Sequence, residues 1–354
     1  MAAVLIGKLF GTAVLAASSG IGTQDPPPQN PSFFNPQMAI VGDFAATLAD
    51  RSGEPRHADF REIEFGFAAD ADPFLKVEAY IGLHKEDGET RLEIEEAFGR
   101  YSNLGRGLSA KFGKLAGAIG RVQRNHADQL NYLNYPLPIV DVFGDHGFRN
   151  PGASFSYLFP GIRFSEITVE LFDASDDEAP LFNSGDLSDP AVAAHYRTFF
   201  DFSEDTSAQL GFSLLSGPTM FDPGSGPVTG RGDVHGIDYT MKHQPGGPGR
   251  SWVLEAEALW SKPGGFDERS FGAFGRFAYE FSPKWFATVG LDYSEIPGTS
   301  NLHRSFLAGV TRKVTEFHHW RLEFERITSN FESDRNVLTL QFQWVIGAHP
   351  AHRY

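Results

Sequence analysis

Residues 116–150 gather ionisable side chains that could set ion preference at a narrow point of a pore. They are interspersed with large apolar side chains such as Tyr132 and Leu137. Charges held at a constriction select ions because a narrow passage focuses their field. Alternatively, these charges pair with one another and pin the segment in place, since buried charges need partners. The candidate residues are Arg121, Arg124, His126, Asp128, Asp141, Asp145 and His146.

Imidazole and carboxylate side chains also occur in local pairs that resemble parts of metal sites. The chain has 12 histidines and no cysteine, which excludes disulfides, Fe–S clusters and thiolate-bound zinc. None of the pairs has a third ligand at a recognisable spacing, so the sequence predicts neither a metal nor a cofactor. The pairs are His126/Asp128, Asp145/His146, His318/His319 and His349/His352.

Residue patterns typical of catalysis are missing from the sequence. No Gly-x-Ser-x-Gly turn joins a strand to a helix, because residues 224–226 fall in a loop. No glycine-rich phosphate loop opens a helix, and the Arg-Gly-Asp at 231–233 is typical of a turn. We therefore expect no enzyme. A Ser/His or Asp/His pair assembled in space at the rim stays open as the basis of a barrel enzyme.

The composition limits the classes of partner. The 354 residues include 30 Lys and Arg against 45 Asp and Glu, a formal charge of −15, which does not suit a nucleic-acid partner. Hydrophobic residues make up 41% of the chain, too many for a disordered protein.

The elements that must position these side chains alternate with a period of two. Ile63, Phe65 and Phe67 share one face of a segment while Glu62 and Glu64 share the other. Such alternation is typical of a half-buried strand. About sixteen segments follow this pattern, and many have about the ten residues that a tilted strand needs to cross a bilayer. They are 38–49, 59–69, 74–83, 91–101, 108–115, 151–159, 162–173, 193–202, 207–216, 234–243, 251–260, 270–281, 285–293, 303–313, 318–328 and 336–347.

The connections between these segments alternate between short turns and longer loops. The longer ones are 50–58, 84–90, 116–150, 174–192, 217–233 and 294–302. This alternation predicts a single antiparallel up-and-down transmembrane β-barrel over 38–354, an all-β fold of about 16 strands with 14 or 18 as alternatives. A soluble barrel or sandwich is the competing fold.

Aromatic residues near strand ends favour the membrane over the soluble fold, because they form girdles at the bilayer interfaces. The chain also ends in an aromatic residue, Tyr354, as bacterial outer-membrane barrels often do. The girdle candidates are Phe60, Tyr80, Tyr101, Tyr157, Trp260, Trp285 and Tyr293.

The polar faces of the strands would line a wet lumen, where carboxylates outnumber cations and should favour cations. Alternatively, these charges form ladders between neighbouring strands. The wall candidates are Glu62, Glu64, Lys76, Glu78, Glu93, Glu95, Glu166, Glu170, Arg197, Asp201, Asp238, Glu255, Glu257, Arg276, Glu280, Glu323 and Glu325.

The first residues look like an export signal. Met1–Thr23 has one lysine, a short apolar stretch and then small residues, the layout of a signal peptide. A buried N-terminal helix is the alternative. Residues 24–37, which include three consecutive prolines, predict a periplasmic linker.

Several short motifs resemble a porin-like family of bacterial outer-membrane proteins, some of whose members are labelled zinc-regulated TonB-dependent outer-membrane receptors. Members tend to carry a second histidine shortly after the one that matches His126, where this chain has Asp128. A TonB-dependent receptor resembles a 22-stranded barrel with a folded plug, and 24–37 leaves no room for one. The motifs are Asn35-Pro36, Val41-Gly42-Asp43-Phe44, Arg61–Gly66, Asp72-Pro73, Glu95–Phe98, Gly113-Lys114, Gly120-Arg121, His126 and Gly347–His352.

Together these observations predict an outer-membrane channel for passive diffusion of ions or small polar solutes, with a preference for cations. In the porins that this architecture resembles, the third extracellular loop folds into the lumen, and 116–150 holds that position. Expected partners are outer-membrane lipid, the barrel-assembly machinery and, as in many porins, two further copies in a homotrimer. The alternatives are a closed barrel acting as a receptor or structural protein, possibly metal-related, and a barrel enzyme.

Overall fold

The computed structural model describes residues 36–50, 56–86, 89–161, 163–175, 179–222, 226–246 and 249–347. The predicted signal peptide, nearly all of the predicted linker, and the C-terminal pair His349/His352 with Tyr354 lie outside these residues. Within the described residues, no helix is long and apolar enough to cross a membrane.

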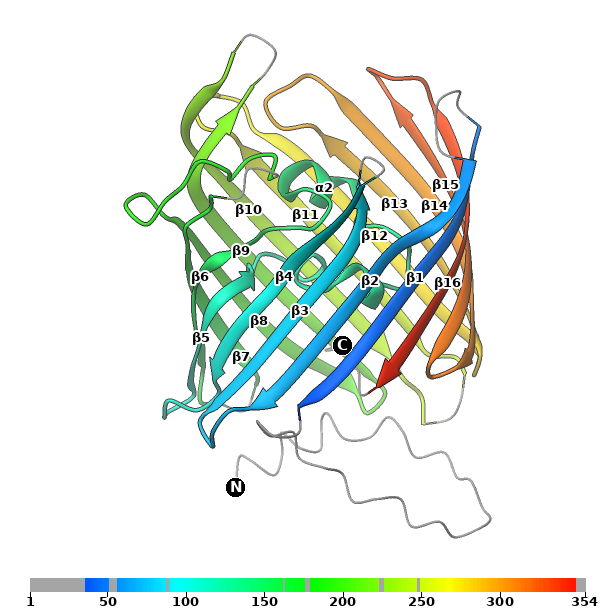
Figure 1. Ribbon diagram of the computed structural model, residues 1–354, viewed down its shortest axis with the longest axis horizontal. Helices are drawn as coiled ribbons and strands as arrows, with labels where there is room; N and C mark the ends of the chain where they lie inside the picture. Colours follow the sequence, from blue (N-terminus) through cyan, green and yellow to red (C-terminus); the bar gives the residue numbers. More distant parts are fainter. Residues whose placement is uncertain are drawn as a thin grey trace. The chain divides into compact units, whose positions relative to one another are not determined.

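The described part of the chain forms sixteen antiparallel strands in a closed barrel (Figure 1). Each strand pairs with its neighbours in sequence, and β1 closes the ring against β16. The predicted all-β up-and-down barrel is confirmed. The strands are β1 (Gln37–Ala49), β2 (Arg56–Asp70), β3 (Leu75–Glu86), β4 (Glu89–Tyr101), β5 (Leu108–Ala116), β6 (Arg149–Leu158), β7 (Ser165–Phe172), β8 (Ala191–Ser203), β9 (Thr206–Phe221), β10 (Val228–His243), β11 (Trp252–Lys262), β12 (Ser270–Ser282), β13 (Trp285–Glu295), β14 (Leu302–Thr315), β15 (His318–Ser329) and β16 (Arg335–Gly347).

Two of the predicted long loops are shorter than expected. Strands β3 and β4 pair as far as Glu86 and Glu89, so 84–90 is mostly strand. Strands β9 and β10 likewise pair to Phe221 and Val228 within 217–233. The ladder continues beyond the alternating residues because backbone pairing does not require an apolar face.

The outer face of the barrel is apolar and the inner face is polar. On β13, Val289 and Leu291 are 45% and 63% exposed on the outside, whereas Thr288 and Asp292 are buried on the inside. This is the reverse of a soluble β-protein and the arrangement of a barrel surrounded by lipid. Tyr80 departs from the predicted girdle, because the register places it on the inner face beside Gly66 and it is 8% exposed.

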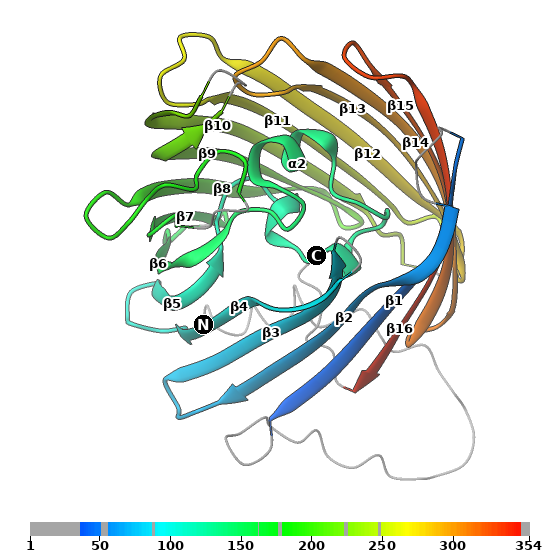
Figure 2. The ribbon, with the colours of Figure 1, turned by 45° about the horizontal axis from the view of Figure 1, so that its top comes forward.

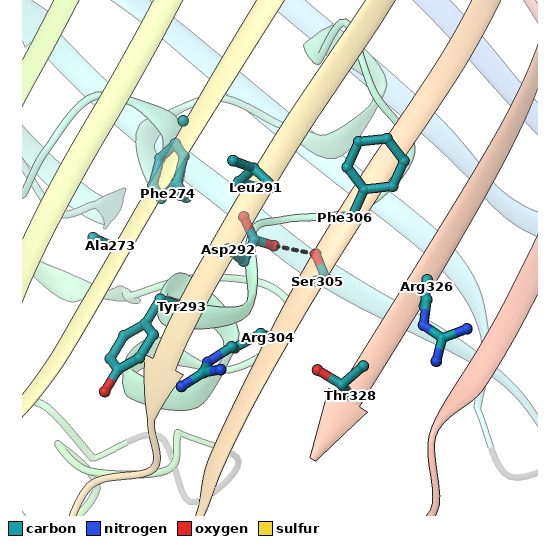
Figure 3. A pocket seen from close by; sticks show the side chains of 11 residues that line it. Ala273, Phe274, Leu291, Asp292, Tyr293, Arg304, Ser305, Phe306, Arg326 and Thr328 are labelled. Atoms are coloured by element: carbon teal, nitrogen blue, oxygen red, sulfur yellow. Dashed lines mark hydrogen bonds between the residues drawn. The ribbon is translucent and has the colours of Figure 1, made fainter.

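A groove of about 520 Å³ crosses strands β12 to β15 (Figure 3). Its apolar lining includes Ala273, Leu291 and Phe306, while Tyr293 and Arg304 lie towards one end. The groove arises because Ala273 and Gly275 fill little space beside these larger residues. The surface that lines the groove is mostly apolar, as expected on the lipid-facing side of a barrel.

The outward face of β13 makes a testable prediction. We expect Leu291→Arg to lower the free energy of unfolding in phospholipid vesicles by about 2–4 kcal/mol, because it places a guanidinium deep in hydrocarbon. Phe202→Arg is the matched control, since Phe202 is equally exposed but lies at the end of β8, where the cost is about 0–1 kcal/mol. Urea titrations followed by tryptophan fluorescence measure both. Equal effects would place Leu291 outside the hydrocarbon.

Candidate functional site

The segment between β5 and β6 lies inside the ring of strands (Figure 2). It contains two single 3-10 turns, η1 (Val122–Arg124) and η2 (Ala127–Gln129), and a short helix, α2 (Leu137–Phe143). The helix begins after Pro136 with a second proline in its first turn, where a missing N–H costs nothing. It ends at Gly144, whose positive φ of 86° suits glycine. We call residues 117–148 the inner segment.

Apolar side chains of the inner segment pack against apolar patches of the wall. Tyr132, Ile139 and Phe148 are at most 1% exposed and belong to one cluster with Leu215 and Leu259, which point inward from β9 and β11. Burial of such side chains contributes roughly 1.5–3 kcal/mol each. The segment is therefore a packed part of the fold.

Carboxylates of the wall accept hydrogen bonds from backbone N–H groups of the inner segment. Glu257 Oε1 accepts from the N–H groups of Arg121 at 2.8 Å and Val122 at 2.7 Å. Glu170 Oε2 accepts from Ala118 N at 2.5 Å. Glycine at position 120 leaves room for the carboxylate of Glu257, because a Cβ there would lie 2.3 Å from Glu257 Oε2. These carboxylates satisfy donors that an irregular buried backbone would otherwise leave unpaired.

Strands elsewhere in the ring hold the same segment by its carbonyl groups. Arg321 on β15 donates to Leu130 O at 2.8 Å, and Gln343 on β16 donates to Asp128 O at 3.0 Å. On β2, Arg61 donates to Leu133 O at 3.2 Å. Together with Glu257 on β11, these bonds come from widely separated strands. The inner segment thus crosses the lumen.

The predicted constriction residues are not gathered into one ring. Arg121 Nε lies 3.5 Å from Glu255 Oε1, and Arg124 Nη1 lies 3.5 Å from His195 Nδ1. Burial, with Arg197 nearby, lowers the pKa of Arg124 to about 10, so its guanidinium stays charged at neutral pH. Asp145 is exposed to solvent.

Asp141 binds two residues of the facing wall. Ser294 Oγ and His303 Nε2 each lie 2.5 Å from Asp141 Oδ2. In a catalytic triad the imidazole stands between the hydroxyl and the carboxylate. Here both groups reach the same carboxylate oxygen, so the contact fixes the inner segment and does not prepare a nucleophile.

His126 and Asp128 lie towards β2, β4 and β16. His126 is 5% exposed, and its ring lies 4.9 Å from that of Tyr80. Its Nδ1 lies 2.8 Å from Glu64 Oε2 and 2.6 Å from Glu95 Oε2, while its Nε2 lies 3.1 Å from Glu96 Oε1. Burial alone would lower the pKa of His126, but Glu64 and Glu95 hold it well above its usual value.

A β-bulge brings two consecutive carboxylates to this histidine. The register of β3 and β4 shifts between Tyr80 and Ile81, so that Tyr80 opposes Glu96 and Ile81 opposes Ile94. Glu95 is the extra residue, and both glutamates reach His126. Strict alternation assigned Glu95 alone to the inner face, so Glu96 was missed. The adjacent pair Glu95-Glu96 shifts the phase of the alternation, and reading β4 with one unbroken period hides that shift.

The alternation and register place the predicted wall residues on the inner face, but many are bound to neighbours. Glu78 Oε1 lies 3.1 Å from Arg100 and 3.4 Å from Lys76. Arg276 forms two bonds to Asp292, at 2.6 and 3.0 Å. The contacts of Glu78 with Arg100 and of Arg276 with Asp292 join neighbouring strands, as in the ladders that the sequence offers as an alternative. Further contacts are Glu166 with Arg197, Glu93 with Lys114, Asp238 with His195, and Glu323 with the backbone of Leu133.

Comparisons with known proteins place the fold among outer-membrane barrels. No protein-family model matches the chain. An uncharacterized protein of Aquifex aeolicus is 23% identical over 85% of this chain and 71% of its own length. Among solved structures, OprB of Pseudomonas putida covers 88% of this chain and 94% of its own, with 10% identity and a TM-score of 0.64. An anion-selective porin from Comamonas acidovorans covers 88% and 99%, with 8% identity and a TM-score of 0.61.

These likenesses define the class of protein. The chain has the sixteen-stranded porin-like fold of outer-membrane β-barrels. Its apolar outer face supports the same assignment. At this level of identity the likeness extends to the fold alone.

The anchoring of the inner segment makes a second prediction. Glu257→Ala removes two hydrogen bonds and leaves two backbone donors unpaired, each at a cost of about 1–3 kcal/mol. We expect docking to weaken by about 3 kcal/mol and trypsin to cut at Arg121 and Arg124 in the folded barrel. Glu255→Ala is the control, because Glu255 lies beside the side chain of Arg121 and not beside its backbone N–H. Resistance of both variants to trypsin would show that packing alone holds the segment.

Proposed function

We propose that the chain is an outer-membrane channel through which ions and small polar solutes diffuse passively, with a preference for cations. The observation that carries this proposal is the inner segment, bound from several strands within a porin-like barrel. A segment that crosses the lumen leaves narrow passages, and narrow passages select by size and charge. The proposal assigns no chemical reaction to the chain.

The charge of the inner wall supports the preference for cations. On β2 and β4, the inward residues Glu62 and Glu93 add acidic charge to the wall beside the buried carboxylates of Glu64 and Glu95. Carboxylates along a pore attract cations and repel anions. The anion-selective porin of Comamonas acidovorans shares the fold at 8% identity, so its wall residues can differ in charge from those of this chain.

The same proposal includes delivery and assembly. Residues 1–23 would direct export, 24–37 would be a periplasmic linker, and the barrel-assembly machinery would insert the barrel into outer-membrane lipid. We expect the chain to form a homotrimer, the oligomeric state of many porins. Chemical crosslinking in native membranes would reveal a ladder ending at three subunits.

A closed barrel is a second candidate, favoured by the many bonds between the inner segment and the wall. It would serve as a receptor or structural protein without conducting ions. Packing of Tyr132 and Ile139 deep inside the ring is the observation behind it.

Single-channel recording in a planar bilayer separates these two candidates. We expect small current steps from the full chain and larger steps after deletion of 124–142, because the deletion removes most of the obstruction. Deletion of 298–300, in the loop between β13 and β14, is the control and should leave conductance unchanged. Silence from the folded full chain, with current only after deletion of 124–142, would establish the closed barrel.

Selectivity is tested by reversal potentials in a salt gradient. Neutralising Glu62 and Glu93 together, as Glu62→Gln and Glu93→Gln, should lower the cation-to-anion permeability ratio roughly twofold or more. Glu204→Gln is the control, because Glu204 is exposed in the turn between β8 and β9. An unchanged ratio in the double variant would exclude this stretch of wall from selectivity.

A further inference from the structure

The cluster around His126 gathers three buried carboxylates around one imidazole. Glu64, Glu95 and Glu96 surround the ring, and all three are at most 7% exposed. The guanidinium of Arg149 lies 4.0 Å from Glu96. Burying several carboxylates around one imidazole is costly unless a positive charge lies among them.

The atoms at the centre of this cluster are close together, but their geometry is poor for hydrogen bonds. His126 Nδ1 is 2.8 Å from Glu64 Oε2 and 2.6 Å from Glu95 Oε2. Both Nδ1 and Glu64 Oε2 are nevertheless buried and lack any partner in hydrogen-bond geometry within the described structure. Three donor atoms of metal-ligand type thus converge on one point.

The opposite side of the ring is fixed by Glu96. His126 Nε2 forms a hydrogen bond to Glu96 Oε1 at 3.1 Å. In metal sites, a carboxylate commonly binds the far nitrogen of a ligating histidine and so leaves the near nitrogen free to bind the ion. Glu96 holds this position relative to Nδ1.

The second oxygen of Glu95 extends the cluster to another imidazole. Glu95 Oε1 lies 3.1 Å from His84 Nε2. The space for both groups exists because position 82 is glycine: a Cβ there would lie 2.2 Å from His84 Nε2 and 2.4 Å from Glu95 Oε1. The carboxylate of Glu95 is thereby steadied from the side away from His126.

We propose that Glu64, Glu95 and His126 bind one divalent transition-metal ion inside the barrel, with Glu96 orienting the histidine. A zinc ion takes imidazole nitrogen at about 2.0–2.1 Å and carboxylate oxygen at about 2.0–2.2 Å. Tetrahedral ligands at these lengths lie about 3.4 Å apart. The two carboxylate oxygens reach that spacing by moving less than about 1 Å, which small side-chain rotations provide.

The donor set also determines the kind of ion. Imidazole nitrogen favours zinc and its neighbours in the transition series, whereas Ca²⁺ and Mg²⁺ prefer all-oxygen sites. With three protein ligands, one position stays open for water or an exchangeable group. A proton on His126 is the competing way to satisfy these carboxylates. This inference does not rest on the proposed channel, since the site depends on the fold alone.

The test measures zinc binding by the untagged full chain, purified in detergent and stripped with a chelator. We expect equilibrium dialysis to show one Zn²⁺ that excess Ca²⁺ does not displace. His126→Gln and Glu64→Gln should each weaken binding at least tenfold, and Glu96→Gln about 10- to 100-fold. His195→Gln is the matched control, because His195 is also a buried lumen imidazole paired with one carboxylate, Asp238.

Heat-modifiable migration on gels shows which variants have folded barrels, and Co²⁺ gives an independent readout. Wild type should give a visible absorption band of nitrogen and oxygen ligation, which Glu64→Gln alters even if His126→Gln fails to fold. Unchanged zinc affinity in the folded His126→Gln and Glu64→Gln variants would overturn the proposal. A protonated His126 would then be what balances the carboxylates. The two proposals can fail separately. Zinc binding by a wild-type chain that conducts no current would support the metal site and reject the channel, and current from a wild-type chain that binds no zinc would do the reverse.

Discussion

Closure of the ring is the constraint on which the rest of the structure depends. In hydrocarbon, every backbone N–H and C=O must be paired within the protein, and an open sheet edge cannot satisfy this. Strand β1 therefore pairs with β16 from Ala39 and Gly347 to Ala49 and Val337. Closure removes the edge but creates an interior, and the polar faces of sixteen strands must then find partners there.

The inner segment and the wall satisfy each other. An irregular backbone brings unpaired N–H and C=O groups into the barrel, and the wall supplies acceptors and donors for them. Glu257 and Arg321 are examples of this exchange from different strands. A carboxylate such as Glu257 thus holds the inner segment in place. Carboxylates with such a role add less to the charge along the lumen than composition alone implies.

The bulge in β4 has the largest local consequence. By inserting Glu95 as an extra residue, it turns an alternating strand into one that presents two adjacent carboxylates to His126. Bulges often re-aim side chains near functional sites. The cost is a locally disrupted ladder, and the result is a dense cluster of potential metal ligands at the contact between wall and inner segment.

The sequence by itself determined that the fold is a barrel of about sixteen strands and which side chains of most strands share a face. Alternation depends only on residues two apart, so Leu291 and Asp292 must lie on opposite faces, and the lipid around the barrel turns Leu291 outward. It also marked the longest loop as special through its length. The sequence did not reveal the partners of that loop. Glu323 accepts a hydrogen bond from Leu133 N, and Arg321 donates one to Leu130 O, both from β15 near the other end of the chain. Only the tertiary structure decided these contacts, the bulge at Glu95 and the meeting of His126 with Glu64, because each arises when distant segments are brought together by closure of the ring.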